Sequence, residues 1–317
     1  MISQLNGKKI VIFGGTGFIG SHLVSALCKE SCQISIISRS YNHSKFFFAS
    51  EPGQVSIKKI SDFNQKNVEE LLDGTDLVFN LIGILNENRK ASFDYVHSEI
   101  PKIIARSAKK MNVSGFIHIS ALNVEKTKTS KYAKSKLDGE LSIREIFANA
   151  IIVKPGVVFG KGDNFTNLFS KISRFTPFLP LIGTPGLSFS NNFLPRFDFK
   201  KKVKLQPLYV GDLVKFLIGV SLKKKKSYEI VGPFVRTFNE IFDIILATKK
   251  RKRIYIPLPF IVADTMALFT ELLPNPILTK DQVKLLKIDS VSAEGLRNLL
   301  KFVKNPVSME VRVSNYL

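Results

Sequence analysis

Close to the N-terminus the chain reads Val11-Ile12-Phe13-Gly14-Gly15-Thr16-Gly17-Phe18-Ile19-Gly20. These residues join a β-branched run, 9–13, to a segment with the apolar spacing of a helix, 18–30. Gly14 allows a tight turn, Gly17 lets the backbone approach a pyrophosphate, and Gly20 lets the helix pack on the strand. The amides of the helix N-terminus add hydrogen-bond donors and a partial positive charge. The segment therefore predicts a dinucleotide site with contacts from Gly14, Gly15, Thr16, Gly17, Phe18, Ile19 and Gly20.

Strand-like and helix-like segments alternate through the first half of the chain. Further strands are expected at 33–37, 55–60, 76–81, 115–119 and 150–153, and further helices at 68–72, 93–111 and 131–147. Regular alternation of this kind indicates a parallel sheet with helices on both faces. The predicted fold is therefore α/β, with a doubly wound parallel Rossmann sheet.

The regular alternation ends after Pro155. Prolines then punctuate a stretch rich in Phe and Gly, at Pro177, Pro180, Pro185, Pro195 and Pro207. We expect an NAD(P)-binding Rossmann domain over 1–160 and a smaller, irregular C-terminal lobe for a substrate or partner over 161–317. The segment around 205–235 is expected to pack back on the Rossmann domain.

The end of the second expected strand carries the cofactor preference. An NAD site places an acidic residue about 20 residues beyond the glycines, whereas this chain has Ser38 and Arg39 there. Because Arg39 can bond a 2′-phosphate, we predict NADP(H), with NAD(H) as the alternative. Arg39 facing solvent or lying over the adenine stays an open alternative. Further expected cofactor contacts are Asp62, after the third strand, and, after the fourth, Asn80, Leu81, Ile82 and Gly83.

A Tyr-x-x-x-Lys pair follows the fifth expected strand. Tyr132 and Lys136 are spaced by one helical turn, so they lie on the same helix face. An ammonium beside a phenol lowers the pKa of the phenol and can also bond a nicotinamide ribose, so Tyr132 could act as general acid or base. Ser120, at the end of that strand, could polarise a carbonyl. The three are the predicted catalytic residues and also cofactor contacts, although chance pairing in a Lys-rich chain remains the alternative.

The excess of basic over acidic residues indicates which binding partners the protein favours. The chain of 317 residues has 47 Lys and Arg against 26 Asp and Glu, a net charge of +21, which favours anionic surfaces such as acidic lipid or an acidic protein. An AT-rich coding sequence would produce the same excess of Lys without selection for binding. The basic runs at 200–204, 223–226 and 249–253 are not interleaved with stacking aromatics, so we expect no nucleic-acid partner.

Cysteine, histidine and hydropathy patterns give further expectations. Cys28 and Cys32 are too few for a disulfide framework, and the histidines show no ligand spacing, so no metal site is expected. No signal peptide is visible, which predicts a cytoplasmic chain. The least polar window, 254–273, contains two prolines and two carboxylates, so it is expected to be at most a peripheral or partner-facing helix. A peripheral position on the inner face of the membrane is the further option for the cytoplasmic chain.

The glycine motif, Ser120 and the Tyr132 and Lys136 pair resemble the short-chain dehydrogenase/reductase superfamily in its extended or atypical, epimerase-like branch. Segments 152–160, 206–212 and, above all, 272–286 resemble bacterial relatives of the NAD(P)-binding accessory subunit of mitochondrial respiratory complex I. This resemblance implies a tightly held NADPH without established turnover and attachment to a membrane NADH:quinone oxidoreductase. It also implies cofactor contacts at Pro155, Gly156 and Val157.

Two functions follow. The first is an NADP(H)-binding accessory or assembly subunit of the membrane oxidoreductase. The alternative is an active NAD(P)-dependent oxidoreductase or epimerase acting on a hydrophobic carbonyl or quinone-like substrate. His97, where many relatives carry Asn, is interpreted either as a proton relay or as a surface or hydrogen-bonded helical histidine.

Overall fold

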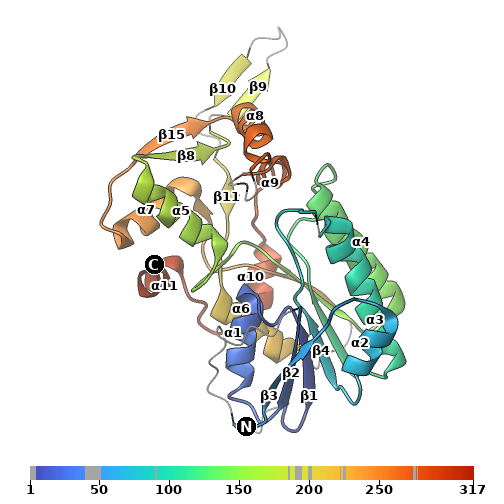
Figure 1. The fold of residues 1–317 in the computed structure, drawn as a ribbon. Coiled ribbons are helices and arrows are strands. Elements are labelled where there is room, and N and C mark those ends of the chain that lie inside the picture. Colours follow the sequence, from blue (N-terminus) through green and yellow to red (C-terminus); the bar gives the residue numbers. More distant parts are fainter. Residues whose placement is uncertain are drawn as a thin grey trace. The chain divides into compact units, whose positions relative to one another are not determined.

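The computed structural model describes residues 5–39, 51–89, 91–184, 186–189, 195–198, 202–221, 223, 226–273, 276 and 278–317. Its main feature is a seven-stranded sheet in the order β3-β2-β1-β4-β5-β6-β13 (Figure 1). Every neighbouring pair from β3 to β6 runs parallel. The predicted doubly wound Rossmann sheet is thus confirmed, and its strands are β1 (Lys9–Phe13), β2 (Gln33–Ser38), β3 (Val55–Lys59), β4 (Leu77–Asn80), β5 (Gly115–Ile119), β6 (Ile151–Pro155) and β13 (Lys226–Ile230).

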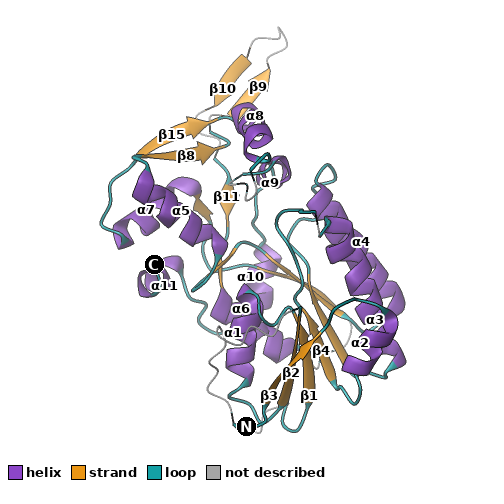
Figure 2. Cartoon of the chain, viewed as in Figure 1, coloured by secondary structure: helices purple, strands orange, loops and turns teal. Residues whose placement is uncertain are grey.

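Helices cover both faces of this sheet (Figure 2). On one face α2 (Gln65–Leu71), α3 (Ile100–Lys110) and α4 (Lys131–Ile146) share one apolar core with the strands, and on the other α1 (Phe18–Leu27) packs on α6 (Val210–Val220). The central strands β1 and β4 are buried on both faces, with only Lys9 of β1 exposed, so they read as apolar runs without alternation.

One helix departs from expectation. The sequence predicts a single helix over 93–111, but the structure has a π-helical turn, η2 (Tyr95–Glu99), before α3. Pro101 follows at the second residue of α3, directly after this turn. A π turn of this kind commonly marks a site with a constraint of its own, and here it presents His97 to the interior.

Contacts divide the chain into two compact units. Unit 1 comprises 1–121, 135–154 and 210–228, and unit 2 comprises 122–134, 155–209 and 229–317. Of the segment 205–235, residues 210–228 thus belong to the same unit as the glycine turn. Helix α4 begins in unit 2 and continues in unit 1.

Unit 2 has short strands and an aromatic core. Strands β8 and β15 pair in parallel, β9 and β10 are antiparallel, and Phe169 stacks on Phe242 with ring centroids 4.7 Å apart. Its strands are β7 (Val158–Phe159), β8 (Phe178–Ile182), β9 (Gly186–Phe189), β10 (Pro195–Asp198), β11 (Lys204–Leu205), β12 (Leu208–Tyr209), β14 (Arg236–Thr237) and β15 (Ile254–Leu258). Its helices are α5 (Asn164–Phe175), α7 (Phe238–Thr248), α8 (Phe260–Thr270), α9 (Lys280–Leu286), α10 (Ala293–Leu300), α11 (Met309–Arg312) and the 3-10 turn η3 (Val313–Asn315).

The length and the hydropathy of a helix decide whether it can cross a membrane. Within the described part of the chain, no helix combines the length and the apolar composition that a membrane crossing needs.

Gly139 provides a test of how closely α4 packs in unit 1. A Cβ at this position would lie 2.0 Å from the carbonyl oxygen of His97. Replacing glycine by alanine inside a helix normally stabilises it by up to about 1 kcal/mol, but here we expect Gly139→Ala to lower the free energy of unfolding by about 2–3 kcal/mol through overpacking. Urea denaturation measures the difference. Lys134→Ala, at an exposed site on the same helix, should change it by less than about 0.5 kcal/mol, and a Gly139→Ala protein as stable as the parent would contradict the close approach.

Candidate nucleotide-binding and active site

The glycine turn between β1 and α1 packs backbone against backbone. Gly14 has a φ of +80°, and a Cβ on it would lie 2.9 Å from the carbonyl carbon of Leu81. A Cβ on Gly20 would lie 2.2 Å from the oxygen of Gly14. Thr16 and Gly17 are exposed, so the turn presents its amides and the N-terminus of α1 to solvent between β1 and β4. This is the crevice where doubly wound sheets bind pyrophosphate, and the turn fits such a group.

The residues predicted to select the ribose lie at the same sheet edge. Ser38 is the last residue of β2 and is half-buried, and Arg39 follows it with an exposed side chain. Asp62 is exposed in the loop before α2, where its carbonyl accepts a hydrogen bond from Asn67 Nδ2 at 3.2 Å. Arg39 forms no ion pair within the described residues.

Buried polar atoms that lack partners among the described residues occur at the carboxyl ends of β4 and β5. Asn80 is fully buried; its Oδ1 accepts from the amide of Ile82 at 3.2 Å, while its Nδ2 has no hydrogen-bond partner among the described residues. Ser120 is 3% exposed, and its Oγ also has no hydrogen-bond partner among the described residues. A buried polar atom without a partner costs about 1–3 kcal/mol. Both atoms therefore fit a site at which a polar ligand would complete the hydrogen bonding.

Lys136 places a cation at the end of β5. Its side chain is buried, and Nζ donates to the carbonyl of Ile119 at 3.0 Å. A Cβ on Gly83 would lie 3.3 Å from this Nζ, so the glycine provides room for the ammonium. Burial lowers the pKa of Lys136 to about 8, partly offset by the charge of Glu140. Glu140 Oε2 lies 3.1 Å from Lys154 Nζ, so a buried ion pair adjoins the site.

His97 is held in one tautomer beside Lys136. The amide of Ile84 donates to Nε2 at 3.0 Å, so Nδ1 carries the proton and donates to Ser135 Oγ at 3.0 Å. Burial and the charge of Lys136 lower the pKa of His97 to about 2. His97 is therefore a neutral, hydrogen-bonded residue that ties the loop after β4 to α4, which matches the second interpretation of it.

Tyr132 stands on the part of α4 that belongs to unit 2. The carboxylate of Asp281 accepts from Ser130 Oγ at 2.6 Å and from the amides of Lys131 and Tyr132 at 2.8 and 2.9 Å, which caps the helix. Burial and the charge of Asp281 raise the pKa of Tyr132 to about 12. The expectation that the ammonium of Lys136 lowers this pKa is thus wrong here, because desolvation and a carboxylate dominate.

Pro155, Gly156 and Val157 also belong to unit 2. The carbonyl of Pro155 accepts from Leu122 at 3.0 Å, the amide of Gly156 donates to Ile230 at 2.9 Å, and the carbonyl of Val157 accepts from Leu208 at 2.8 Å. Their backbone is therefore tied within this unit. As cofactor contacts they remain predictions.

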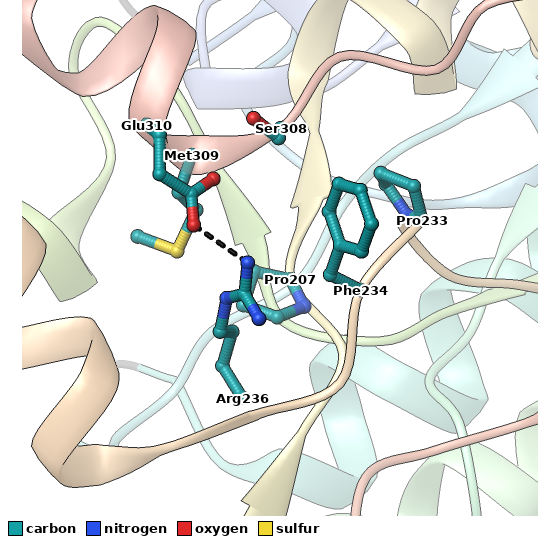
Figure 3. A pocket seen from close by; sticks show the side chains of 7 residues that line it. All are labelled: Pro207, Pro233, Phe234, Arg236, Ser308, Met309 and Glu310. Atoms are coloured by element: carbon teal, nitrogen blue, oxygen red, sulfur yellow. Dashed lines mark hydrogen bonds and ion pairs between the residues drawn. The ribbon is translucent and has the colours of Figure 1, made fainter.

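A small cavity in unit 2 carries no ligand site. It has a volume of about 10 Å³, enough for about one water, and Arg236 in its wall is paired with Glu310 at 2.7 Å (Figure 3). Its lining consists of Pro207, Pro233, Phe234, Arg236, Ser308, Met309 and Glu310. In the described ranges no group of His, Cys, Asp and Glu side chains is close enough to hold a metal ion.

Sequence reasoning assigned no role to four residues of this region. Ser135 and Glu140 lie three and eight residues beyond Tyr132 on α4, and Lys154 precedes Pro155. Helical spacing from Lys136 to Glu140 was an available signal for a charge pair. The role of Asp281 had no local signal, because its partners lie about 150 residues away in the chain.

The depressed pKa of Lys136 gives a titration test. Between about pH 8 and about 10.5 the unfolded chain binds a proton at this lysine and the folded chain does not, so the free energy of unfolding rises with pH in this window. Relative to Lys136→Met, the wild type should gain about 3 kcal/mol across it. NMR of 13Cε-labelled lysine should show one resonance, missing in Lys136→Met, that titrates near pH 8. A Lys136 signal that titrates together with those of the exposed lysines would refute the burial.

Comparisons with known proteins show which families and proteins the chain resembles. Residues 6–156 match the model of the NmrA-like family. Subunit 9 of the alpha subcomplex of mitochondrial NADH dehydrogenase (ubiquinone) 1 from Mus musculus is 29% identical over 316 residues, which are 98% of this chain and 80% of that protein. The 40 kDa subunit of mitochondrial NADH-ubiquinone oxidoreductase from Neurospora crassa is 25% identical over 284 residues, 89% and 71% of the two chains.

Among solved structures, an NADPH-dependent quinone oxidoreductase from Escherichia coli, complexed with NADPH, superposes with a TM-score of 0.70 at 16% identity, covering 95% of this chain and 97% of that one. This likeness shows the fold. The near full-length similarity to the mitochondrial subunits shows that the chain, with its Rossmann sheet, resembles the subunit 9 proteins of complex I.

Proposed function

We propose that this protein is an NADP(H)-binding accessory or assembly subunit of a membrane NADH:quinone oxidoreductase. The observation that carries the proposal is the similarity to subunit 9 of the mitochondrial enzyme over 98% of the chain. Similarity of this extent includes the C-terminal half, where a shared dinucleotide fold alone would not require it. The nucleotide then stabilises the fold by mass action, by about 4 kcal/mol at a thousandfold excess over its Kd.

The residues of unit 1 are suited to a nicotinamide dinucleotide. The glycine turn and the N-terminus of α1 would receive the pyrophosphate, and Arg39 the 2′-phosphate of NADP(H). Asn80 Nδ2 and Ser120 Oγ, both buried without partners among the described residues, would donate to the bound cofactor. When bound, NADPH supplies a hydride donor. A carboxylate at the end of β2 would favour NAD(H), and the described part of this edge has the exposed Arg39 instead.

Substitutions at the end of β2 test the preference for NADP(H). Arg39→Ala should weaken NADPH binding about tenfold or more, because a charge-assisted hydrogen bond contributes about 1.5–3 kcal/mol, and should leave NADH binding unchanged. Ser38→Asp should shift the preference toward NADH by repelling the 2′-phosphate. Isothermal titration calorimetry measures both Kd values. Arg106→Ala, at an exposed site on α3, is the control. If both variants discriminate the two nucleotides as the parent does, the assignment of this edge is wrong.

The same buried groups support a second function. Lys136, with a pKa lowered to about 8, and the Oγ of Ser120 lie at the carboxyl end of β5 in unit 1, where an oxidoreductase or epimerase would polarise a hydrophobic carbonyl or quinone-like substrate. The raised pKa of Tyr132 would keep its phenol protonated, which suits it as a general acid and disfavours it as a base. In the accessory subunit these residues hold the cofactor.

Helix α8 is the proposed docking surface for the oxidoreductase. It buries Ala263 and Ala267 and packs Phe260 against the rest of unit 2, but it leaves its other large apolar side chains exposed. Ile261 is 59% exposed and Phe269 is 69% exposed. A small-residue face turned inward and a large apolar face turned outward is the reverse of a solvated surface helix, and such patches mark interaction sites. With the net charge of +21, we place the protein on the cytoplasmic side, peripheral to an anionic membrane surface.

Co-migration with the active complex tests this function. Native membranes are solubilised mildly, separated on a native gel and stained for NADH:quinone oxidoreductase activity, and the chain is detected in the active band. The wild type should be present there. Ile261→Ser with Phe269→Ser should remove it from the band, whereas Leu141→Ser, which is 55% exposed on α4, should leave it.

Absence of the wild-type chain from the band would overturn the accessory role. The enzyme would then be tested by NADPH oxidation across carbonyl and quinone substrates. Loss of turnover in Tyr132→Phe with NADPH binding unchanged would support that alternative.

A further inference from the structure

A second polar surface lies in unit 2, on residues that neither the glycine turn nor Lys136 involves. The C-terminal half of α5 and the residues after α7 form an open depression of about 400 Å³. Its lining carries four cations and no carboxylate, and consists of Asn167, Ser170, Lys171, Arg174, Phe175, Lys249 and Arg251.

The polar stripe of α5 follows from helical spacing. Asn167, Lys171 and Arg174 are separated by four and three residues, so they share one face of the helix. Each of the three is exposed, and α5 itself contains no acidic residue. On α7, Lys249 is the C-cap and is half-buried. The positive charges of the two helices thus converge on one depression.

One of the four cations has a structural task. Arg251 donates from Nη1 to the carbonyl of Ser170 and to Ser173 Oγ, both at 3.0 Å, and so ties the segment after α7 to the C-terminal half of α5. Lys171, Arg174 and Lys249 form no ion pair within the described residues. Three like charges without a counter-charge repel one another, and an anion in the depression would remove this repulsion.

The border of the depression is apolar. Phe175 is 75% exposed, with the Arg174 guanidinium 5.8 Å from its ring centroid. Three residues further along the chain, Phe178 on β8 pairs in register with Ile254 on β15, and the two are 46% and 61% exposed. A small soluble anion gains nothing from exposed aromatic and aliphatic side chains. Cations beside such side chains are typical of surfaces that lie at the membrane interface.

We propose that this depression binds the phosphate-bearing headgroup of an anionic phospholipid. Lys171, Arg174 and Lys249 contact the phosphate, while Phe175 and the pair of Phe178 and Ile254 enter the boundary between headgroups and acyl chains. The proposal rests on the membrane location in the proposed function and names the residues that mediate it. It concerns the purified chain alone, so it can fail while association with the oxidoreductase holds, and the reverse.

Vesicle binding by the full chain tests the proposal. The probes are vesicles of phosphatidylglycerol with phosphatidylcholine, vesicles of phosphatidylcholine alone, and soluble inorganic phosphate, all at one ionic strength. The test variant carries Lys171→Gln, Arg174→Gln and Lys249→Gln. The control carries Lys29→Gln, Arg106→Gln and Lys109→Gln, which removes the same charges from exposed positions on unit 1. Far-UV circular dichroism and thermal unfolding establish that both variants are folded.

We expect the wild type to bind the anionic vesicles and to show no binding to vesicles of phosphatidylcholine alone. The test variant should lose affinity about a hundredfold, because each cation near an anionic surface contributes about a factor of five, and the control should lose much less. Phe175→Ser should also weaken binding. Equal losses in both triple variants would mean that only net charge acts and would overturn the site. Absence of vesicle binding, or binding of inorganic phosphate that the test variant alone loses, would overturn the lipid as the occupant.

Discussion

The backbone contact at the glycine turn is the constraint on which the rest of unit 1 depends. Gly14 lies so close to Leu81, and Gly20 so close to Gly14, that no side chain fits at either glycine. This brings α1 onto the sheet and leaves its N-terminal amides in the crevice between β1 and β4, where the strand order reverses. A nucleotide site here is thus a consequence of how the first helix must pack, and its position follows from the order of the strands.

Polar groups that are costly to bury gather at the same edge of the sheet. Three polar side chains are buried there: Lys136, Asn80 and Ser120. Asn80 Nδ2 and Ser120 Oγ have no hydrogen-bond partner among the described residues. Each such atom lowers the stability of the protein without ligand. A ligand that forms a hydrogen bond with it removes this free-energy cost. An accessory subunit in which the nucleotide maintains the fold would be built in this way, since binding then acts on stability as much as on chemistry.

Most of the fold of unit 1 could be predicted because its strands are buried apolar runs bounded by turns. Both bounds of β1 and of β5 agree with the sequence prediction. The surroundings of His97 could not be predicted, because its partners are the amide of Ile84 and Ser135 on α4, which only the folded chain brings together. For the site, the spacing of Tyr132 and Lys136 was visible in the sequence, but their pKa directions depend on burial and on Asp281, which only the folded chain brings into place.

The cap that Asp281 provides has a consequence for synthesis of the protein. Helix α4 starts at Lys131, but the carboxylate that satisfies its first amides is about 150 residues further along the chain. While the chain leaves the ribosome, the sheet of unit 1 can begin to assemble as its strands emerge, whereas the first turn of α4 must wait for α9. Tyr132 therefore reaches its final surroundings only near the end of translation, and in a prematurely terminated chain only the local cap by Ser130 Oγ would remain at this end of α4.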